Sequence, residues 1–137
     1  MPDSDAEAFI RNANRRVAPL LTALHEALLA SGCHPYVKTI YIGYDIDGEM
    51  VAAAYPHADH VEVALALEAD HDDPLLQDAS HLTWRTLPVA AHISSKGQVK
   101  QFSQLATEAC ARVRAGTHDV HRDNDYFIKT RRERKRY

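Results

Sequence analysis

The feature that most constrains the fold is a change of hydrophobic period at Tyr36. Before it, residues 4–30 place apolar side chains at steps of three and four, which is the spacing of one stripe along an α-helix. After it, apolar and polar residues alternate, which is typical of a β-strand with one buried face. A helical segment followed directly by strands predicts an α+β domain. The helical stripe consists of Phe9, Ala13, Val17, Leu20, Leu21, Leu24 and Leu28.

The helical segment has a breaker inside it and a stop signal after it. Pro19 removes a backbone donor and strains the preceding turn, so we expect two helices with a break near Val17 to Pro19. Gly32 suits the left-handed conformation that ends many helices, and Pro35 cannot continue one. The sequence therefore predicts that the helical part ends near Gly32.

The alternating part of the chain is divided by two turn signals. Residues 36–46 are expected to form one strand, and the pair Asp47-Gly48 is typical of a two-residue hairpin turn. A second strand follows over about residues 49–55, and Pro56 marks the turn before a third alternating stretch. The three strands are expected to form an antiparallel meander. Their bulky face carries Ile40, Ile42, Tyr44, Ile46, Val61, Val63, Leu65 and Leu67.

The second half of the chain begins without a clear period. Residues 70–88 hold four Asp and two Pro, so a long loop is expected there, followed by a short strand over residues 89–93. Ser94 or Ser95 can then cap a helix, and Gln98 would complete a capping box with Ser95. That helix should run over residues 96–115 with its own apolar stripe. Gly116 is expected to end it.

These elements predict a two-layer α+β fold: a four-stranded, mainly antiparallel sheet with the N- and C-terminal helices on one face. Residues 1–116 are expected to form a single domain, and residues 117–137 a basic C-terminal extension. The opposite face of the sheet, with small residues such as Gly43, Ala64 and Ala66, is left bare in this prediction. A bare face of small residues leaves room for another layer, so we expect a homodimer or another partner there.

Length and composition indicate the broad class of protein. The chain has 137 residues, enough for one core, and no apolar run reaches the roughly 18 to 20 residues that cross a bilayer. Its acidic start does not resemble a secretory signal, so a cytoplasmic protein without membrane contact is expected. Cys33 and Cys110 are far apart in the sequence and lack CxxC spacing. We interpret them as reduced thiols that pack like apolar residues.

Two stretches of the chain carry a resemblance to a known family. The stretches are IYIGYDIDGEMVAAAYPHADHVEVALAL and LTWRTLPVAAHISSKGQVKQFSQLATEA. Their succession resembles an uncharacterised domain family found alone in small bacterial proteins and at the C-terminus of predicted restriction-type proteins. The resemblance covers about residues 8–115. It implies an association with nucleic-acid defence systems, and it implies no catalytic residues.

The C-terminal extension has a charge opposite to that of the rest of the chain. The chain has 16 basic and 19 acidic residues; six basic residues and one acidic residue lie in residues 126–137, which leaves 10 basic and 18 acidic in residues 1–125. A basic tail attracts phosphate backbones, and an acidic body repels them. We therefore expect a small binding module that associates with nucleic acid through its tail, although a solvated or self-associating tail stays open. The expected phosphate contacts are Lys129, Arg131, Arg132, Arg134, Lys135 and Arg136.

The alternative prediction is a small-molecule-binding protein or enzyme with a pocket under residues 70–88. Trp84 can stack on a planar ligand, and Arg85 can bind its phosphate or carboxylate, with Tyr41 of the sheet as a further ligand-binding residue. The competing interpretation is that Trp84 folds inward and pins the loop to the sheet. No phosphate-binding glycine loop or nucleophile elbow is present, so the sequence identifies no catalytic residue.

The nine histidines raise the question of a metal site. His57 and His60 have H-x-x-H spacing, and so do His118 and His121, which suits zinc ligands. The first pair lies in an expected turn, where polar residues are common in any case. We therefore interpret both pairs as solvated loop residues and predict no metal and no cofactor.

Overall fold

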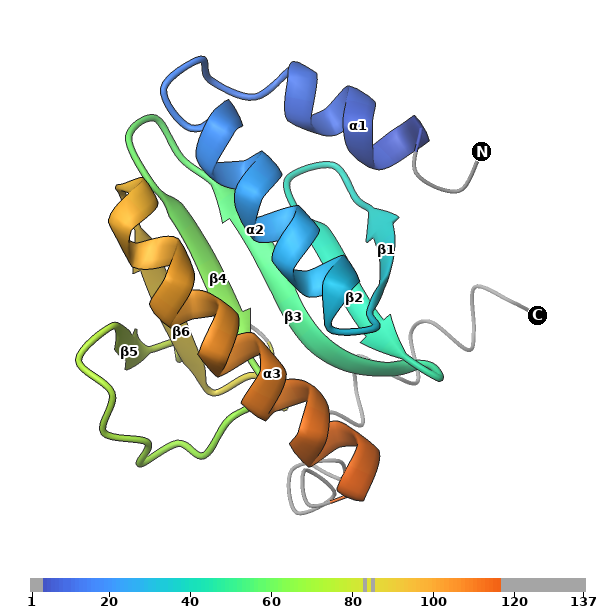
Figure 1. Cartoon of the computed structure of the whole chain (residues 1–137), viewed down its shortest axis with the longest axis vertical. Helices are drawn as coiled ribbons and strands as arrows, with labels where there is room; N and C mark the ends of the chain where they lie inside the picture. Colours follow the sequence, from blue (N-terminus) through green and yellow to red (C-terminus); the bar gives the residue numbers. More distant parts are fainter. Residues whose placement is uncertain (1–3, 83, 85, 117–137) are drawn as a thin grey trace.

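The structure is a computed structural model of the chain, and it describes residues 4–82, 84 and 86–116. Within these residues the chain forms three α-helices, a short 3₁₀ turn and six strands. All strand pairs are antiparallel, and the order across the sheet is β1-β2-β3-β4-β6-β5 (Figure 1). The α+β class is confirmed, whereas the prediction of four strands is wrong. The elements are α1 (Ser4–Arg11), α2 (Ala18–Ala30), β1 (His34–Val37), β2 (Ile42–Ile46), β3 (Glu49–Pro56), β4 (Val61–Leu65), β5 (Leu76–Asp78), β6 (Val89–Ile93), η1 (Lys96–Gln98) and α3 (Val99–Ala115).

Several local signals in the sequence are confirmed. The N-terminal helical segment is split, and Pro19 lies in the first turn of α2, where the missing backbone donor has no intrahelical partner to lose. Asp47 and Gly48 join β2 to β3 with positive φ angles of 52° and 83°, as a primed two-residue turn requires. The side chain of Gln98 accepts a hydrogen bond from the backbone of Ser95 at 3.1 Å. Gly116 ends α3 in the left-handed conformation.

The stretch predicted as one strand over residues 36–46 is instead a hairpin. Val37 of β1 pairs with Ile42 of β2, and the backbone N–H of Lys38 donates to the carbonyl of Tyr41 at 2.9 Å across the connection. Ile40 was expected in the core, but it lies at the tip and is 66% exposed. The alternation of apolar residues runs through the turn without a break in the sequence, so periodicity alone does not reveal it.

One face of the sheet is covered by helices. In Figure 1, α2 and α3 cross the sheet on the same side, and α1 lies next to α2. The strand register places Tyr44, Ala52, Leu65 and Val89 in one row across four strands. Tyr44 also reaches His25 of α2, which identifies this row with the helix-covered face. The helices therefore pack on the bulky side of the sheet, as expected, and Leu24 and Phe102 are fully buried there among the core residues.

The reverse face of the sheet is not bare. Gly43, Ala53, Ala64 and Ala90 follow one another across four strands, and all four are buried. The connection between β5 and β6 lies over this side, because its Trp84 reaches Tyr55 of β3. The prediction of an exposed alanine face is therefore wrong, and the homodimer that was expected on it loses this surface. Small side chains on the sheet here accommodate a segment of the same chain.

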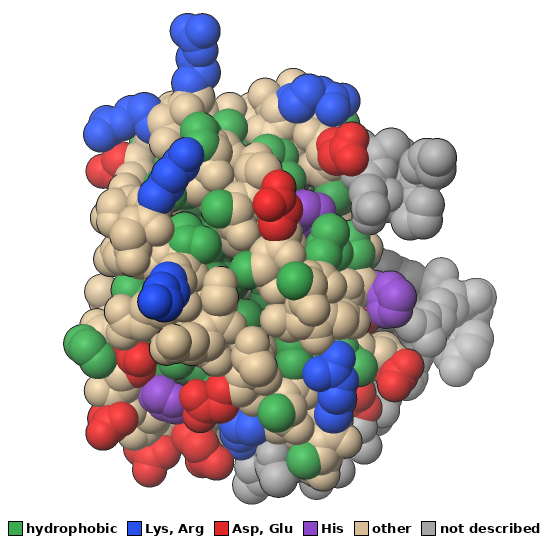
Figure 2. All heavy atoms as spheres, viewed as in Figure 1, with side chains coloured by type: hydrophobic (Ala, Val, Ile, Leu, Met, Phe, Trp, Pro, Cys, Tyr) green, Lys and Arg blue, Asp and Glu red, His purple; other side chains and the backbone are tan. Residues whose placement is uncertain are grey.

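The long connection between β4 and β6 is tied to both sides of the domain. Its first part is bound to α3, where Arg112 pairs with Glu68 at 3.2 Å and His71 lies 3.2 Å from Glu108. It then forms β5, which pairs with β6 at the edge of the sheet and was not expected from the sequence. In Figure 2 acidic side chains gather at the lower left, where Figure 1 places the connection that follows β4. Three exposed acids of that connection are Glu68, Asp70 and Asp72.

In the part of the chain that the structure describes, no helix combines the length and the apolar character needed to span a membrane.

Candidate functional site

A buried carboxylate lies on the reverse face of the sheet. Glu62 is the second residue of β4 and is only 4% exposed. Its neighbours in the strand register are Tyr55 of β3 and His92 of β6, so these side chains point to the same face. Burying a carboxylate is costly unless hydrogen-bond donors or cations surround it. The donors that surround Glu62 therefore define the candidate site.

Three imidazoles surround the Glu62 carboxylate. The Nε2 atom of His81 lies 2.6 Å from Oε2, the Nε2 atom of His57 lies 3.4 Å from Oε1, and the Nε2 atom of His92 lies 3.4 Å from Oε2. A carboxylate only accepts hydrogen bonds, so a ring bonded to it donates from Nε2. In a neutral ring this leaves Nδ1 as the basic nitrogen. We call Glu62, His57, His60, His81 and His92 the Glu62 cluster.

The fourth imidazole, that of His60, joins the cluster by stacking. Its ring lies parallel to that of His57 at 4.5 Å between centroids and parallel to that of His92 at 5.4 Å. The turn between β3 and β4 is closed by a backbone hydrogen bond of 2.8 Å from His57 to His60, which brings the two rings together. Asp59 lies 2.8 Å from His60 Nδ1, and this contact lowers the pKa of Asp59.

The surroundings of His92 lower its pKa. Burial lowers its pKa, and the neighbouring His60, His81 and His57 act in the same direction. The Glu62 carboxylate opposes them and raises the pKa. Because burial prevails, His92 is a neutral ring at neutral pH. The cluster therefore combines a buried carboxylate with imidazoles whose side chains are partly exposed to solvent.

A group of aromatic rings borders the cluster. Trp84 donates from Nε1 to the Tyr55 hydroxyl at 2.9 Å, and the Tyr41 ring packs against Tyr55 at 5.0 Å and against Trp84 at 6.0 Å. Tyr36 continues the group and covers Gly43 so closely that a Cβ there would overlap the ring. Burial raises the pKa of Tyr55. This aromatic group forms an apolar wall beside Glu62.

Two of the three residues predicted to bind a ligand thus lie together. Trp84 is 7% exposed and Tyr41 is half-buried, and their rings meet edge to face. The inward orientation of Trp84 agrees with the interpretation that it pins the connection to the sheet. Arg85 lies outside the described residues, and ligand binding by Tyr41 and Trp84 stays a prediction.

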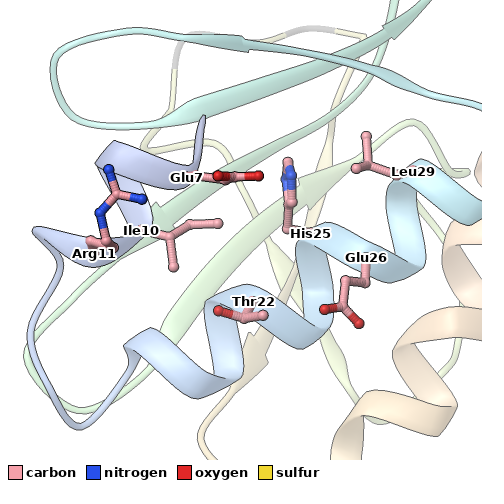
Figure 3. A pocket seen from close by; sticks show the side chains of 7 residues that line it. All are labelled: Glu7, Ile10, Arg11, Thr22, His25, Glu26 and Leu29. Carbon is pink, nitrogen blue, oxygen red and sulfur yellow. The ribbon is translucent and has the colours of Figure 1, made fainter. Parts of the chain in front are cut away.

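The helix side has a polar hollow of its own, between α1 and α2, of about 370 Å³. In Figure 3, the Glu7 carboxylate of α1 extends toward the His25 ring of α2. His25 is 6% exposed, and its Nδ1 shares a hydrogen bond of 2.8 Å with the Tyr44 hydroxyl. Burial raises the pKa of Tyr44, so this hydroxyl stays neutral. The remaining lining side chains are those of Ile10, Arg11, Thr22, Glu26 and Leu29.

Several predicted sites fall outside the described residues. These are His118 and His121 of the second H-x-x-H pair and the six basic residues expected to contact nucleic acid, Lys129, Arg131, Arg132, Arg134, Lys135 and Arg136. Over residues 4–82, 84 and 86–116, no group of three or more His, Cys, Asp or Glu side chains is arranged to hold a metal ion. The imidazoles of His57, His81 and His92 contact the Glu62 carboxylate itself.

Sequence reasoning found one pair of this cluster and missed its centre. His57 and His60 were noticed through their spacing, but as solvated turn residues. Glu62 lies on the face of the sheet that was expected to be bare. The available signal was the pattern Val-Glu-Val inside a strand whose flanking connections are rich in histidine. His81 and His92 are far from Glu62 in sequence, so only the sheet register and the folded connection bring them together.

Comparisons of this chain with protein-family models, with curated proteins and with solved structures find no match. The family resemblance drawn from residues 8–115 therefore stays a prediction.

Proposed function

We propose that the protein binds a small polar molecule at the Glu62 cluster and removes a proton from it by general-base catalysis. The observation that carries this proposal is the contact of 2.6 Å between the buried Glu62 carboxylate and Nε2 of His81. A carboxylate in this position orients an imidazole, selects the tautomer with its proton on Nε2, and stabilises the imidazolium that forms when Nδ1 takes up a proton.

The side-chain exposures of Glu62 and His81 support a carboxylate that orients the ring and an imidazole that acts on the ligand. The side chain of Glu62 is 6% exposed and that of His81 is 54% exposed. The carboxylate is thus withdrawn from solvent, while the ring it orients can reach a ligand. His57 is similarly open, with 46% of its side chain exposed, and it bonds the other carboxylate oxygen. We assign the base to His81, because its contact with Glu62 is the shorter one.

The neighbouring rings suggest the kind of molecule that fits. Tyr55 is the register partner of Glu62, and Trp84 and Tyr41 pack around it. Aromatic edges beside a polar group favour a small, flat ligand with an exchangeable proton. This is the alternative drawn from the sequence, a small-molecule site under residues 70–88.

The hollow between α1 and α2 is less suited to acid–base chemistry. Its histidine, His25, is almost fully buried, and Nδ1 already shares a hydrogen bond with Tyr44. An imidazole enclosed in this way stabilises the packing of α2 on the sheet. A ring that exchanges protons with a ligand needs one nitrogen open to that ligand.

The test uses 5-nitrobenzisoxazole, a small flat molecule whose ring opens when a base removes its C–H proton. We expect ring opening above the buffer rate at pH 7.5, and a loss of about tenfold or more of this excess in His81→Gln and in Glu62→Gln. His34→Gln is the matched control, because His34 is an exposed histidine of β1 outside the cluster. If His81→Gln and His34→Gln lose the same small fraction of activity, His81 has no special role and the proposal fails.

Association with nucleic acid through residues 126–137 is a separate proposal, supported by the charge of that segment. Replacing Arg131, Arg132, Arg134 and Arg136 by Gln should weaken binding to a single-stranded oligonucleotide and flatten its salt dependence. Fluorescence anisotropy at several salt concentrations measures both effects. An unchanged salt dependence in this variant would reject the tail as the binding segment.

A further inference from the structure

Two cysteines that are far apart in the sequence touch in the fold. Cys33 lies between the end of α2 and β1, and Cys110 lies in the second half of α3. Their sulfur atoms are 3.4 Å apart across a sequence separation of 77 residues. Both thiols are free, and their residues are 5% and 0% exposed. Both thiols pack in the hydrophobic core like apolar residues, as the sequence indicated, but their contact with each other was not predicted.

The two sulfur atoms differ in their chemical environment. The hydrogen bond with Cys33 lowers the pKa of Cys110, and the Arg114 guanidinium acts in the same direction. The same hydrogen bond raises the pKa of Cys33, and burial raises it further. Arg114 is held in place because its Nη2 donates to the carbonyl of Ser31 at 2.8 Å. Cys110 is thus the sulfur with more thiolate character, and Cys33 is its proton donor.

We propose that Cys33 and Cys110 form an intramolecular disulfide when the protein meets a peroxide. A disulfide needs a sulfur separation of about 2.05 Å, so the two atoms, now 3.4 Å apart, must approach by about 1.4 Å. Rotation of the two side chains supplies a movement of this size. The inference does not depend on the Glu62 cluster, which lies on the other face of the sheet.

The reaction proceeds in two balanced steps. The Cys110 thiolate attacks one oxygen of hydrogen peroxide and breaks the O–O bond, which gives a Cys110 sulfenic acid and hydroxide. The Cys33 sulfur then attacks the Cys110 sulfur, the S–O bond breaks, and the hydroxyl leaves as water with the Cys33 proton. In total, two thiols and one peroxide give one disulfide and two waters. The two sulfurs are oxidised, and the peroxide is reduced.

The bond would join two elements that already pack together. Cys33 follows α2, and α2 packs against α3, which carries Cys110. A cross-link here closes a loop that contains all six strands of the described sheet. Because a closed loop restricts the unfolded chain, the oxidised protein should be harder to unfold than the reduced one.

The test is oxidation of the whole protein with a small excess of hydrogen peroxide, followed by denaturation, alkylation with iodoacetamide and intact-mass measurement. We expect a monomer that has lost two hydrogen atoms, takes up no alkyl group, and recovers both thiols after treatment with dithiothreitol. Its melting temperature should rise by about 10 °C over the reduced form.

Two single variants separate the roles of the sulfurs. In Cys33→Ser, the sulfenic acid on Cys110 has no resolving thiol, so dimedone should trap it. In Cys110→Ser, Cys33 should react with peroxide at least about tenfold more slowly, because it lacks thiolate character. Two alkylated thiols in the wild-type protein after peroxide treatment, or a disulfide found only between two molecules, would overturn the proposal.

Discussion

The two faces of the sheet bury polar groups in different ways. On the helix side, the buried Tyr44 hydroxyl meets His25, and the buried Cys33 thiol meets Cys110. On the reverse side, the carboxylate of Glu62 is buried and meets imidazoles. The helix side is sealed by two long elements, whereas the reverse side is bordered by turns and a connection whose histidines are partly exposed.

The difference between the two faces of the sheet indicates which surroundings allow a carboxylate to be buried. A helix layer contributes mainly apolar side chains, and burial beneath it raises the pKa of Tyr44, so this hydroxyl stays neutral. A turn and a connection contribute short polar side chains that can surround a carboxylate and still contact water. The reverse face is therefore the side where proton exchange with a ligand is feasible.

The largest expected effect tests whether the reverse side is as well packed as the helix side. Phe102→Ala removes a fully buried ring under the helices, and Trp84→Ala removes a ring that is 7% exposed over the reverse face. Each should lower the free energy of unfolding by about 3–5 kcal/mol. Urea denaturation followed by circular dichroism measures both. A cost below about 1 kcal/mol for Trp84→Ala would mean that the connection adds little to the core.

The next largest effect concerns the hydrogen bond between Tyr44 and His25 on the helix side. Tyr44→Phe removes the hydroxyl that shares a hydrogen bond with His25 Nδ1, on a side chain that is fully buried. Leaving a buried polar atom without this bond should cost about 1–3 kcal/mol of stability. The same urea titration applies. Stability equal to that of the wild type would show that the hydroxyl is not needed to satisfy His25.

The matched substitution on the reverse side should have a smaller effect. Tyr55→Phe removes the acceptor of the Trp84 Nε1 hydrogen bond, but Tyr55 is only half-buried. Water can replace part of that bond, so the expected cost is about 0.5–1.5 kcal/mol. If Tyr55→Phe proves more costly than Tyr44→Phe, the proposed contrast between a sealed side and an open side is wrong.

The smallest expected effect is a change in proton affinity. The folded state holds the pKa of His92 below the usual histidine value of about 6.5, so it binds fewer protons than the unfolded chain. The contribution of His92 to stability is therefore lost as the pH falls through about 6.5 toward its folded pKa. Glu62→Gln removes the charge that raises this pKa, so the pKa of His92 should fall further.

Proton NMR titration of the His92 ring in both proteins measures this change. An unchanged or higher pKa in Glu62→Gln would show that the carboxylate does not act on His92. The titration of His34, an exposed ring outside the cluster, serves as the internal control.

Local signals in the sequence were sufficient where a single residue decides the backbone. Pro19 lies in the first turn of α2, Asp47 and Gly48 make the β2–β3 turn, and Gly116 ends α3. Proline fixes φ and removes a donor, and glycine adopts positive φ without steric cost, so their effect can be read without tertiary information. The β1–β2 hairpin was missed because residues 38–41 contain none of them.

The amphipathic pattern of the chain, by itself, determined the α+β class and the face of the sheet on which the helices pack, because burial of apolar stripes requires that arrangement. Only the tertiary structure decided what lies on the reverse face and which distant side chains meet there. The contacts of Glu62 with His81 and of Cys33 with Cys110 depend on strand order and on the path of connections. Strand order and the paths of the connections arise from the packing of the whole chain, so local periodicity does not predict these contacts.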